Sequence, residues 1–146
     1  MNIYVCVKHV PDSAATITIR EKNQIDESVT FLLNPYDEHA VEEAARLNAK
    51  TEGSEVVAVT VGKEAAMTTL QSALAMGADR GILIKTDNRP DSILTARALK
   101  AAIEQDGKPD IIFTGKESID NEGMQTMFRL AARGQYPEDQ NLRLGW

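Results

Sequence analysis

The sequence predicts an α/β protein built on a doubly wound parallel sheet. Four short apolar runs alternate along the chain with longer segments of helical periodicity, and these runs are Ile3–Val7, Glu55–Gly62, Gly81–Lys85 and Ile111–Thr114. The first two runs are rich in β-branched residues and lack polar alternation, which is typical of strands that a parallel sheet buries on both faces. If the strand order is 3-2-1-4, the order reverses between strands one and four, and a ligand crevice is expected beyond their carboxyl ends.

The segment between the first strand and the first helix predicts a peripheral hairpin. Lys8–Asp12 contains a proline and is expected to be a loop. Two β-prone runs, Ile17–Ile19 and Val29–Leu33, flank the polar segment Glu21–Ser28. This pattern favours an antiparallel pair outside the main sheet.

Helix signals alternate with the strands. The first helix is expected to begin at Asn34, which can cap the free N–H groups, with a proline at the first helical position and Asp37 at the positive end of the helix dipole. The second helix is expected over about residues 64–76, the third from residue 91 or 92, and a fourth from near Glu122.

Composition limits the classes of function. The chain has 146 residues, enough for one domain with a core, and its formal net charge is −6. The negative charge argues against non-specific binding to nucleic acids or anionic membranes. A single cysteine, Cys6, excludes an intramolecular disulfide and a cysteine-based zinc site. The sequence contains no apolar run close to a membrane span of about 18 residues and begins without signal-peptide features, which predicts a cytoplasmic protein with no membrane insertion.

The stretch Pro109–Thr126 has the pattern of a strand that ends in a glycine and leads to a helix start, a common way to hold a phosphate or adenylate group. It is not a P-loop, because Asp110 stands where the first glycine should be and Glu117 follows the lysine. A nicotinamide site is also disfavoured, since Lys8–Asp12 replaces the glycine-rich turn after strand one.

At the start of the fourth helix, an ordinary N-cap among residues 120–123 is favoured by pattern alone over a phosphate held by the N–H groups near residues 124–126. No catalytic or metal-binding constellation emerges elsewhere. His9 and His39 are too few for a metal cluster, and Cys6 lies inside a strand without a paired base. The site is therefore expected to bind a ligand and not to catalyse a reaction.

The chain resembles the N-terminal part of the electron transfer flavoprotein beta subunit, including FixA-like members. The resemblance depends on five segments in the same order and spacing, namely Val5–Asp12, Asn34–Leu47, Leu74–Ile82, Pro109–Lys116 and Ser118–Thr126. It implies an adenine-nucleotide-hydrolase-like fold and a non-catalytic electron carrier subunit that binds AMP. In electron-bifurcating relatives an FAD occupies the same place.

The resemblance also implies partners. An alpha subunit, with the beta subunit packed against it, holds the redox FAD. Electrons come from acyl-CoA or similar dehydrogenases and pass to a quinone oxidoreductase or another acceptor.

Carried over by position, the implied adenylate site comprises Cys6, Asn34, Pro35, Tyr36, Asp37, Val61, Gly115, Lys116, Glu117, Ser118, Ile119, Asp120, Asn121, Glu122, Gly123, Met124, Gln125 and Thr126. Two of these residues depart from the family pattern. Glu117 stands where glutamine is usual and adds negative charge, and Met124 offers no side-chain hydrogen bond where asparagine or another small residue is common.

The resemblance covers residues 1–133, which we expect to form one nucleotide-binding α/β domain. It stops at Gly134, and Gly134–Trp146 has no apolar period, which predicts an irregular tail that is not family sequence. An altered reading frame or a shortened gene would produce such an end. In the family, the later part holds the loop that docks dehydrogenases and much of the alpha-subunit interface.

Two other functions fit the general fold. A stand-alone adenine-nucleotide-binding module of the universal-stress type would carry a glycine-rich phosphate loop after strand four, and this chain lacks one. A small adenylating hydrolase or ligase would need a pyrophosphate loop rich in serine and glycine after strand one, which Lys8–Asp12 is not.

Overall fold

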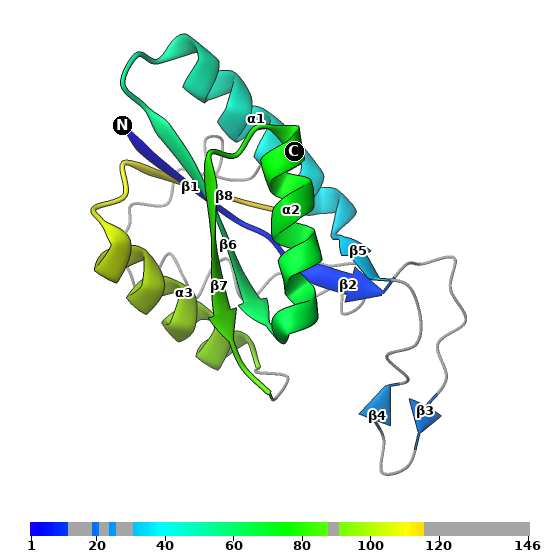
Figure 1. Ribbon diagram of the computed structural model, residues 1–146. Coiled ribbons are helices and arrows are strands. Elements are labelled where there is room, and N and C mark those ends of the chain that lie inside the picture. Colours follow the sequence, from blue (N-terminus) through cyan, green and yellow to red (C-terminus); the bar gives the residue numbers. More distant parts are fainter. Residues whose placement is uncertain (12–18, 21–23, 26–30, 88–90, 116–146) are drawn as a thin grey trace.

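The computed structural model describes residues 1–11, 19–20, 24–25, 31–87 and 91–115. Its main sheet has four parallel strands in the order β7-β6-β1-β8 (Figure 1). The strands are β1 (Asn2–Cys6), β6 (Glu55–Gly62), β7 (Arg80–Lys85) and β8 (Ile111–Thr114). This order is the 3-2-1-4 that was assumed, which the sequence itself does not show, and it reverses between the first and fourth strands of the sheet.

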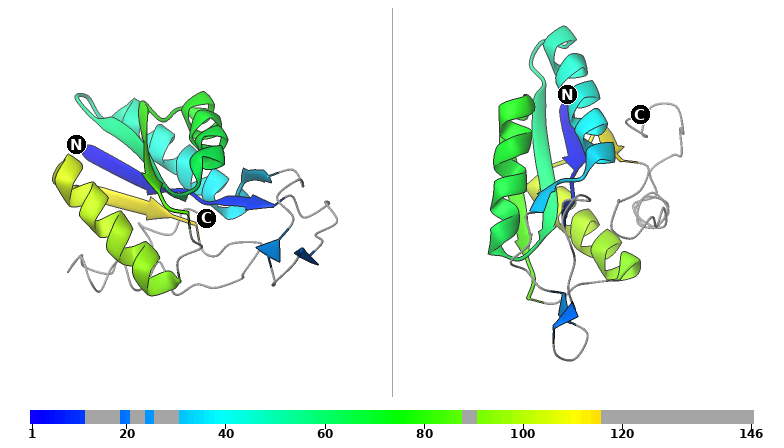
Figure 2. Two further views of the ribbon diagram at one scale, coloured as in Figure 1. Left: turned by 60° about the horizontal axis from the view of Figure 1, so that its bottom comes forward. Right: turned by 90° about the vertical axis from the view of Figure 1, so that its right-hand side faces the viewer.

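Within the described residues, three helices cover the two faces of this sheet. They are α1 (Pro35–Lys50), α2 (Met67–Met76), which follows the 3₁₀ turn η2 (Glu64–Ala66), and α3 (Ser92–Asp106). Figures 1 and 2 show α1 and α2 on one side of the sheet and α3 on the other. Helices on both faces of a parallel sheet make the doubly wound architecture that the sequence predicts.

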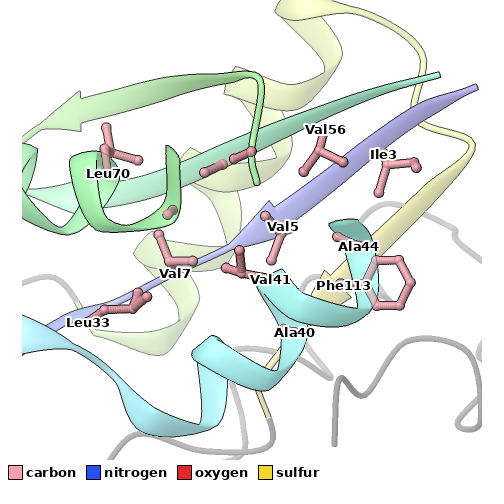
Figure 3. Packing of buried hydrophobic residues seen from close by; sticks show 13 residues of the cluster. Ile3, Val5, Val7, Leu33, Ala40, Val41, Ala44, Val56, Leu70 and Phe113 are labelled. Atoms are coloured by element: carbon pink, nitrogen blue, oxygen red, sulfur yellow. The ribbon is translucent and has the colours of Figure 1, made fainter. Parts of the chain in front are cut away.

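Successive strand residues alternate between two apolar clusters, because side chains in a strand point to opposite faces. On the side of α1 and α2, Ile3 and Val5 pack with Val41 and Phe113, as Figure 3 shows. On the other side, Tyr4 packs with residues of α3 that include Leu99 and Ile103. Both faces of β1 are therefore buried, which explains why its sequence lacks polar alternation.

The segment before α1 differs in part from expectation. His9–Pro11 forms strand β2, which pairs antiparallel with β5 (Phe31–Leu33), so the prediction of a loop was wrong there. Burial explains the difference, because Val10 and Leu33 are almost fully buried. A small antiparallel hairpin is present, as predicted, but its strands are β3 (Ile19–Arg20) and β4 (Gln24–Ile25).

The ends of the three helices are closed in different ways, and the expected side-chain cap at Asn34 is wrong. Asp91 caps α3, since its side chain accepts a hydrogen bond of 2.8 Å from the backbone N–H of Leu94. Gly77 follows α2 with a φ of 125°, a conformation that favours glycine. Asn34 precedes α1 but makes no side-chain cap hydrogen bond. Its side chain hydrogen-bonds instead to the Asp37 carboxylate.

The predicted fourth helix and the tail Gly134–Trp146 lie outside the described residues. Within the part of the chain that is described, no helix combines the length and the apolar character needed to cross a membrane.

Candidate functional site

The carboxyl ends of β1 and β8 lie side by side where the strand order reverses. Cys6 and Thr114, the last residues of the two strands, are register partners. The start of α1 is fastened to this edge, because the backbone N–H of Asn34 donates to the carbonyl oxygen of Lys8 at 2.9 Å. Three segments that are distant in sequence therefore meet at one edge, where doubly wound sheets bind their ligands.

Asp37 joins these segments. One carboxylate oxygen accepts a hydrogen bond from the backbone N–H of Lys8 at 2.8 Å, and the other accepts from that of Gly115 at 3.0 Å. The side chain of Asn34 hydrogen-bonds to the same carboxylate. Burial raises the pKa of Asp37 to about 7, while these three hydrogen bonds and the charge of Lys8 oppose the rise. The carboxylate is thus buried and surrounded by donors.

Gly115 is a glycine because β8 ends very close to the first turn of α1. A Cβ atom at this position would overlap a carboxylate oxygen of Asp37. It would also lie 2.9 Å from the carbonyl carbon of Tyr36 and 3.0 Å from the backbone nitrogen of Asp37. Close packing against α1 is therefore sufficient to explain why this position is a glycine.

The opposite face of the same edge contains Cys6 and Thr114. Burial raises the pKa of the Cys6 thiol to about 12, with the nearby Asp37 charge adding to the effect, so the thiol is protonated at neutral pH. The Thr114 hydroxyl is buried and has no hydrogen-bond partner among the described residues. A buried hydroxyl without a partner is costly, and a polar ligand group at this edge would satisfy it.

The sequence-predicted site residues divide into three groups. Asn34, Asp37 and Gly115 are directly joined, with Tyr36 against Gly115 and Cys6 within electrostatic reach of Asp37. Pro35 is exposed at the start of α1, and Val61 lies on β6 opposite Ile84 of β7, packed against the cluster under α3. The remaining residues lie outside the described part of the chain: Lys116, Glu117, Ser118, Ile119, Asp120, Asn121, Glu122, Gly123, Met124, Gln125 and Thr126.

Sequence reasoning missed two contributors to this edge. Lys8 acts through its main-chain N–H and carbonyl groups, for which a side-chain pattern gives no signal. Thr114 was part of the candidate stretch Pro109–Thr126 but was not named as a site residue, although a polar residue at the carboxyl end of an apolar run was a usable signal.

The described residues give no arrangement for acid, base or metal chemistry. His9 contacts the Thr69 hydroxyl at 2.7 Å and stacks on Phe31, and burial lowers its pKa, so its ring serves packing between β2, β5 and α2. Across the described ranges no group of three or more His, Cys, Asp or Glu side chains could hold a metal ion. What this edge offers a ligand among the described residues is the Thr114 hydroxyl, since the N–H groups of Lys8 and Gly115 already donate to Asp37.

A comparison with known families adds the deciding observation. Residues 22–138 match the family described as "Electron transfer flavoprotein domain". The chain belongs to this family. The match spans most of the chain and includes α1, β6, α2, β7, α3 and β8, while β1 and Lys8 precede the matched residues.

The chain is a homologue of electron transfer flavoprotein beta subunits and FixA proteins. It is 40% identical over 131 residues to the electron transfer flavoprotein subunit beta of Syntrophomonas wolfei, a match that covers 90% of this chain and 52% of the relative. It is 40% identical over 141 residues to protein FixA of Azorhizobium caulinodans, covering 91% of this chain and 50% of the relative.

A eukaryotic relative shows a similar identity and coverage. The mitochondrial electron transfer flavoprotein subunit beta of Arabidopsis thaliana is 36% identical over 140 residues, which cover 94% of this chain and 55% of the relative. The chain thus spans about half the length of the curated relatives that it matches.

Proposed function

We propose that this chain acts as an electron transfer flavoprotein beta subunit, or as its N-terminal nucleotide-binding part, and that it binds AMP or the adenylate half of FAD. The observation that carries the proposal is the junction at the carboxyl edge of β1 and β8, where Asp37 fastens Gly115 and the Lys8 loop to the start of α1. In a member of this family, that edge is where a nucleotide is expected.

The edge suits an adenylate in two respects. The buried Thr114 hydroxyl lacks a partner among the described residues and can accept or donate a hydrogen bond. The chain leaves β8 through Gly115 and continues into residues 116–126, whose backbone N–H groups we expect to contact the phosphate. Asn34, Pro35, Tyr36, Asp37, Cys6 and Val61 complete the proposed site.

The partner is proposed to be an FAD-bearing electron transfer flavoprotein alpha subunit. The FAD supplies the redox chemistry, and this chain contributes binding and support. Acyl-CoA or similar dehydrogenases as donors and a quinone oxidoreductase as acceptor belong to the same proposal. The family match favours this function over a stand-alone module of the universal-stress type.

Three measurements test the proposal. Mass spectrometry of small molecules released from the purified protein should detect AMP or FAD, and adding AMP should raise the melting temperature. Recovery of neither nucleotide, with no thermal shift on adding either one, would exclude the binding function. Co-expression with an alpha subunit, followed by size exclusion with flavin absorbance, should give one flavin-containing peak, and separate elution of the two chains would contradict the partnership.

A further inference from the structure

The position of the Asp37 side chain suits it to a different role from that of the other proposed site residues. We propose that Asp37 is a positioning residue, whose carboxylate holds the Lys8 and Gly115 backbones in place for the nucleotide without itself contacting it. The inference rests on the proposed nucleotide site and assigns a task within it.

The first argument is that both oxygens of the carboxylate are already used. One accepts from the Lys8 N–H and the other from the Gly115 N–H, at 2.8 and 3.0 Å. The Asn34 amide adds a third hydrogen bond, and only 6% of the residue is exposed. An anionic phosphate would be repelled by this charge, so a direct contact with the carboxylate is unfavourable.

The second argument is the close fit between Asp37 and Gly115. A methyl group on residue 115 would occupy the space of a carboxylate oxygen. The carboxylate therefore fixes where the chain leaves β8 and enters the segment proposed to hold the phosphate. Pairing of β1 with β8 ends at Cys6 and Thr114, and beyond it the Asp37 side chain holds Lys8 and Gly115 at the edge where doubly wound folds bind ligands.

The protonation of the Asp37 carboxyl can be followed separately from that of its neighbours. The described groups that act on it electrostatically are Lys8, in the turn after β1, and Cys6, on β1 itself. Burial raises the pKa of the Cys6 thiol to about 12, so it stays neutral over the range in which the carboxyl, with a pKa of about 7, changes charge. Hydrogen bonds to the ionised carboxylate are the stronger ones, so the attachment of Lys8 and Gly115 should weaken as pH falls below 7.

The test begins with the unmodified 146-residue chain. In a ¹⁵N spectrum recorded from pH 5.5 to 8.5, the Lys8 and Gly115 amide signals should shift together with one midpoint near 7. Unrelated midpoints, or no shift at either amide, would overturn the inference without any variant and without nucleotide.

Asp37→Asn removes the charge and keeps the shape. At pH 8.5 it should speed hydrogen exchange of the Gly115 amide about tenfold and weaken AMP binding about tenfold, since a hydrogen bond to a charged group contributes about 1.5–3 kcal/mol. At pH 5.5 the variant and wild type should bind AMP alike, because both then carry a neutral side chain. The titration of AMP itself is common to the two proteins.

Asp79→Asn is the matched control. The Asp79 carboxylate accepts a backbone hydrogen bond from Val56 at 2.8 Å, but at the amino edge of the sheet, so this variant should keep the wild-type AMP profile. Equal AMP affinity in Asp37→Asn and wild type at pH 8.5, despite faster Gly115 exchange, would refute the positioning role. Absence of AMP binding by wild type would refute the proposed nucleotide site, while the amide signals still decide whether Asp37 holds the two backbones.

Discussion

Replacing Asp37 by asparagine should flatten the dependence of folding stability on pH. Asp37 is buried, and burial raises its pKa from an ordinary 3.8 to about 7 in the folded chain. Between these two values the folded state holds a proton that the unfolded state has lost. Stability contributed by this group is therefore fully present below about pH 4, falls as pH rises to 7, and is constant above that.

The expected size follows from the same values. One proton of difference between the states changes the free energy of unfolding by about 1.4 kcal/mol per pH unit, and the full window corresponds to roughly 4 kcal/mol. Asparagine does not titrate, so the variant lacks this slope. From pH 5 to pH 6 the free energy of unfolding of wild type should therefore fall by about 1.4 kcal/mol relative to that of Asp37→Asn.

Urea unfolding followed by far-UV circular dichroism at pH 5, 6, 7 and 8 measures this difference. Other titrating groups, such as His9, are shared by both proteins and cancel in the comparison. Asp79→Asn keeps Asp37 and should show the wild-type slope. Parallel stability curves for wild type and Asp37→Asn from pH 5 to 7 would refute the reasoning, because they would mean that the carboxyl titrates alike in the folded and unfolded states.

Four further substitutions test the fold, one of them as a control. Ile103→Ala should lower the free energy of unfolding by about 2–5 kcal/mol in the same urea titration, because this side chain of α3 is fully buried. Leu94→Ala on the same helix is the control. There 53% of the residue is exposed, and the change should be less than about 0.5 kcal/mol. Tyr4→Phe removes a 2.7 Å hydrogen bond to Asp106 and should cost about 1–2 kcal/mol by the same measurement, and an unchanged midpoint would show that this bond contributes nothing. Asp91→Ala removes the cap of α3 and should lower the melting temperature, corresponding to about 1 kcal/mol, with an unaltered melting curve as the contrary result.

Periodicity was sufficient to predict the strands of the main sheet, whereas their order was an assumption. Buried parallel strands give continuous β-branched runs, and β1 and β6 could be located from this signal alone. The pairing of His9–Pro11 with Phe31–Leu33 could not be predicted, because it joins short segments separated by about 20 residues and depends on burial of Val10 and Leu33. The hydrophobic pattern of a short segment does not indicate which distant segment it pairs with.

The site was predictable in location but not in its interactions. The reversal of strand order and the family resemblance both indicated the carboxyl edge, and the structure brings Asn34, Asp37 and Gly115 together there. Asn34 and Asp37 each looked like an ordinary helix-start residue, since capping statistics describe only contacts within the first turn. Their actual partners include the backbones of Lys8 and Gly115, which are 29 and 78 residues away from Asp37.

The central position of β1 has a consequence for how the chain folds during synthesis. β1 can pair with β6, and β6 with β7, as soon as the chain has been made through Lys85. The other side of β1 must wait for β8, since Ile3 pairs with Ile111, and contacts of such sequence separation form slowly. Until then the edge of β1 that will pair with β8 stays unpaired and can associate with other chains. The candidate nucleotide edge is therefore the last part of the described sheet to be completed on the ribosome.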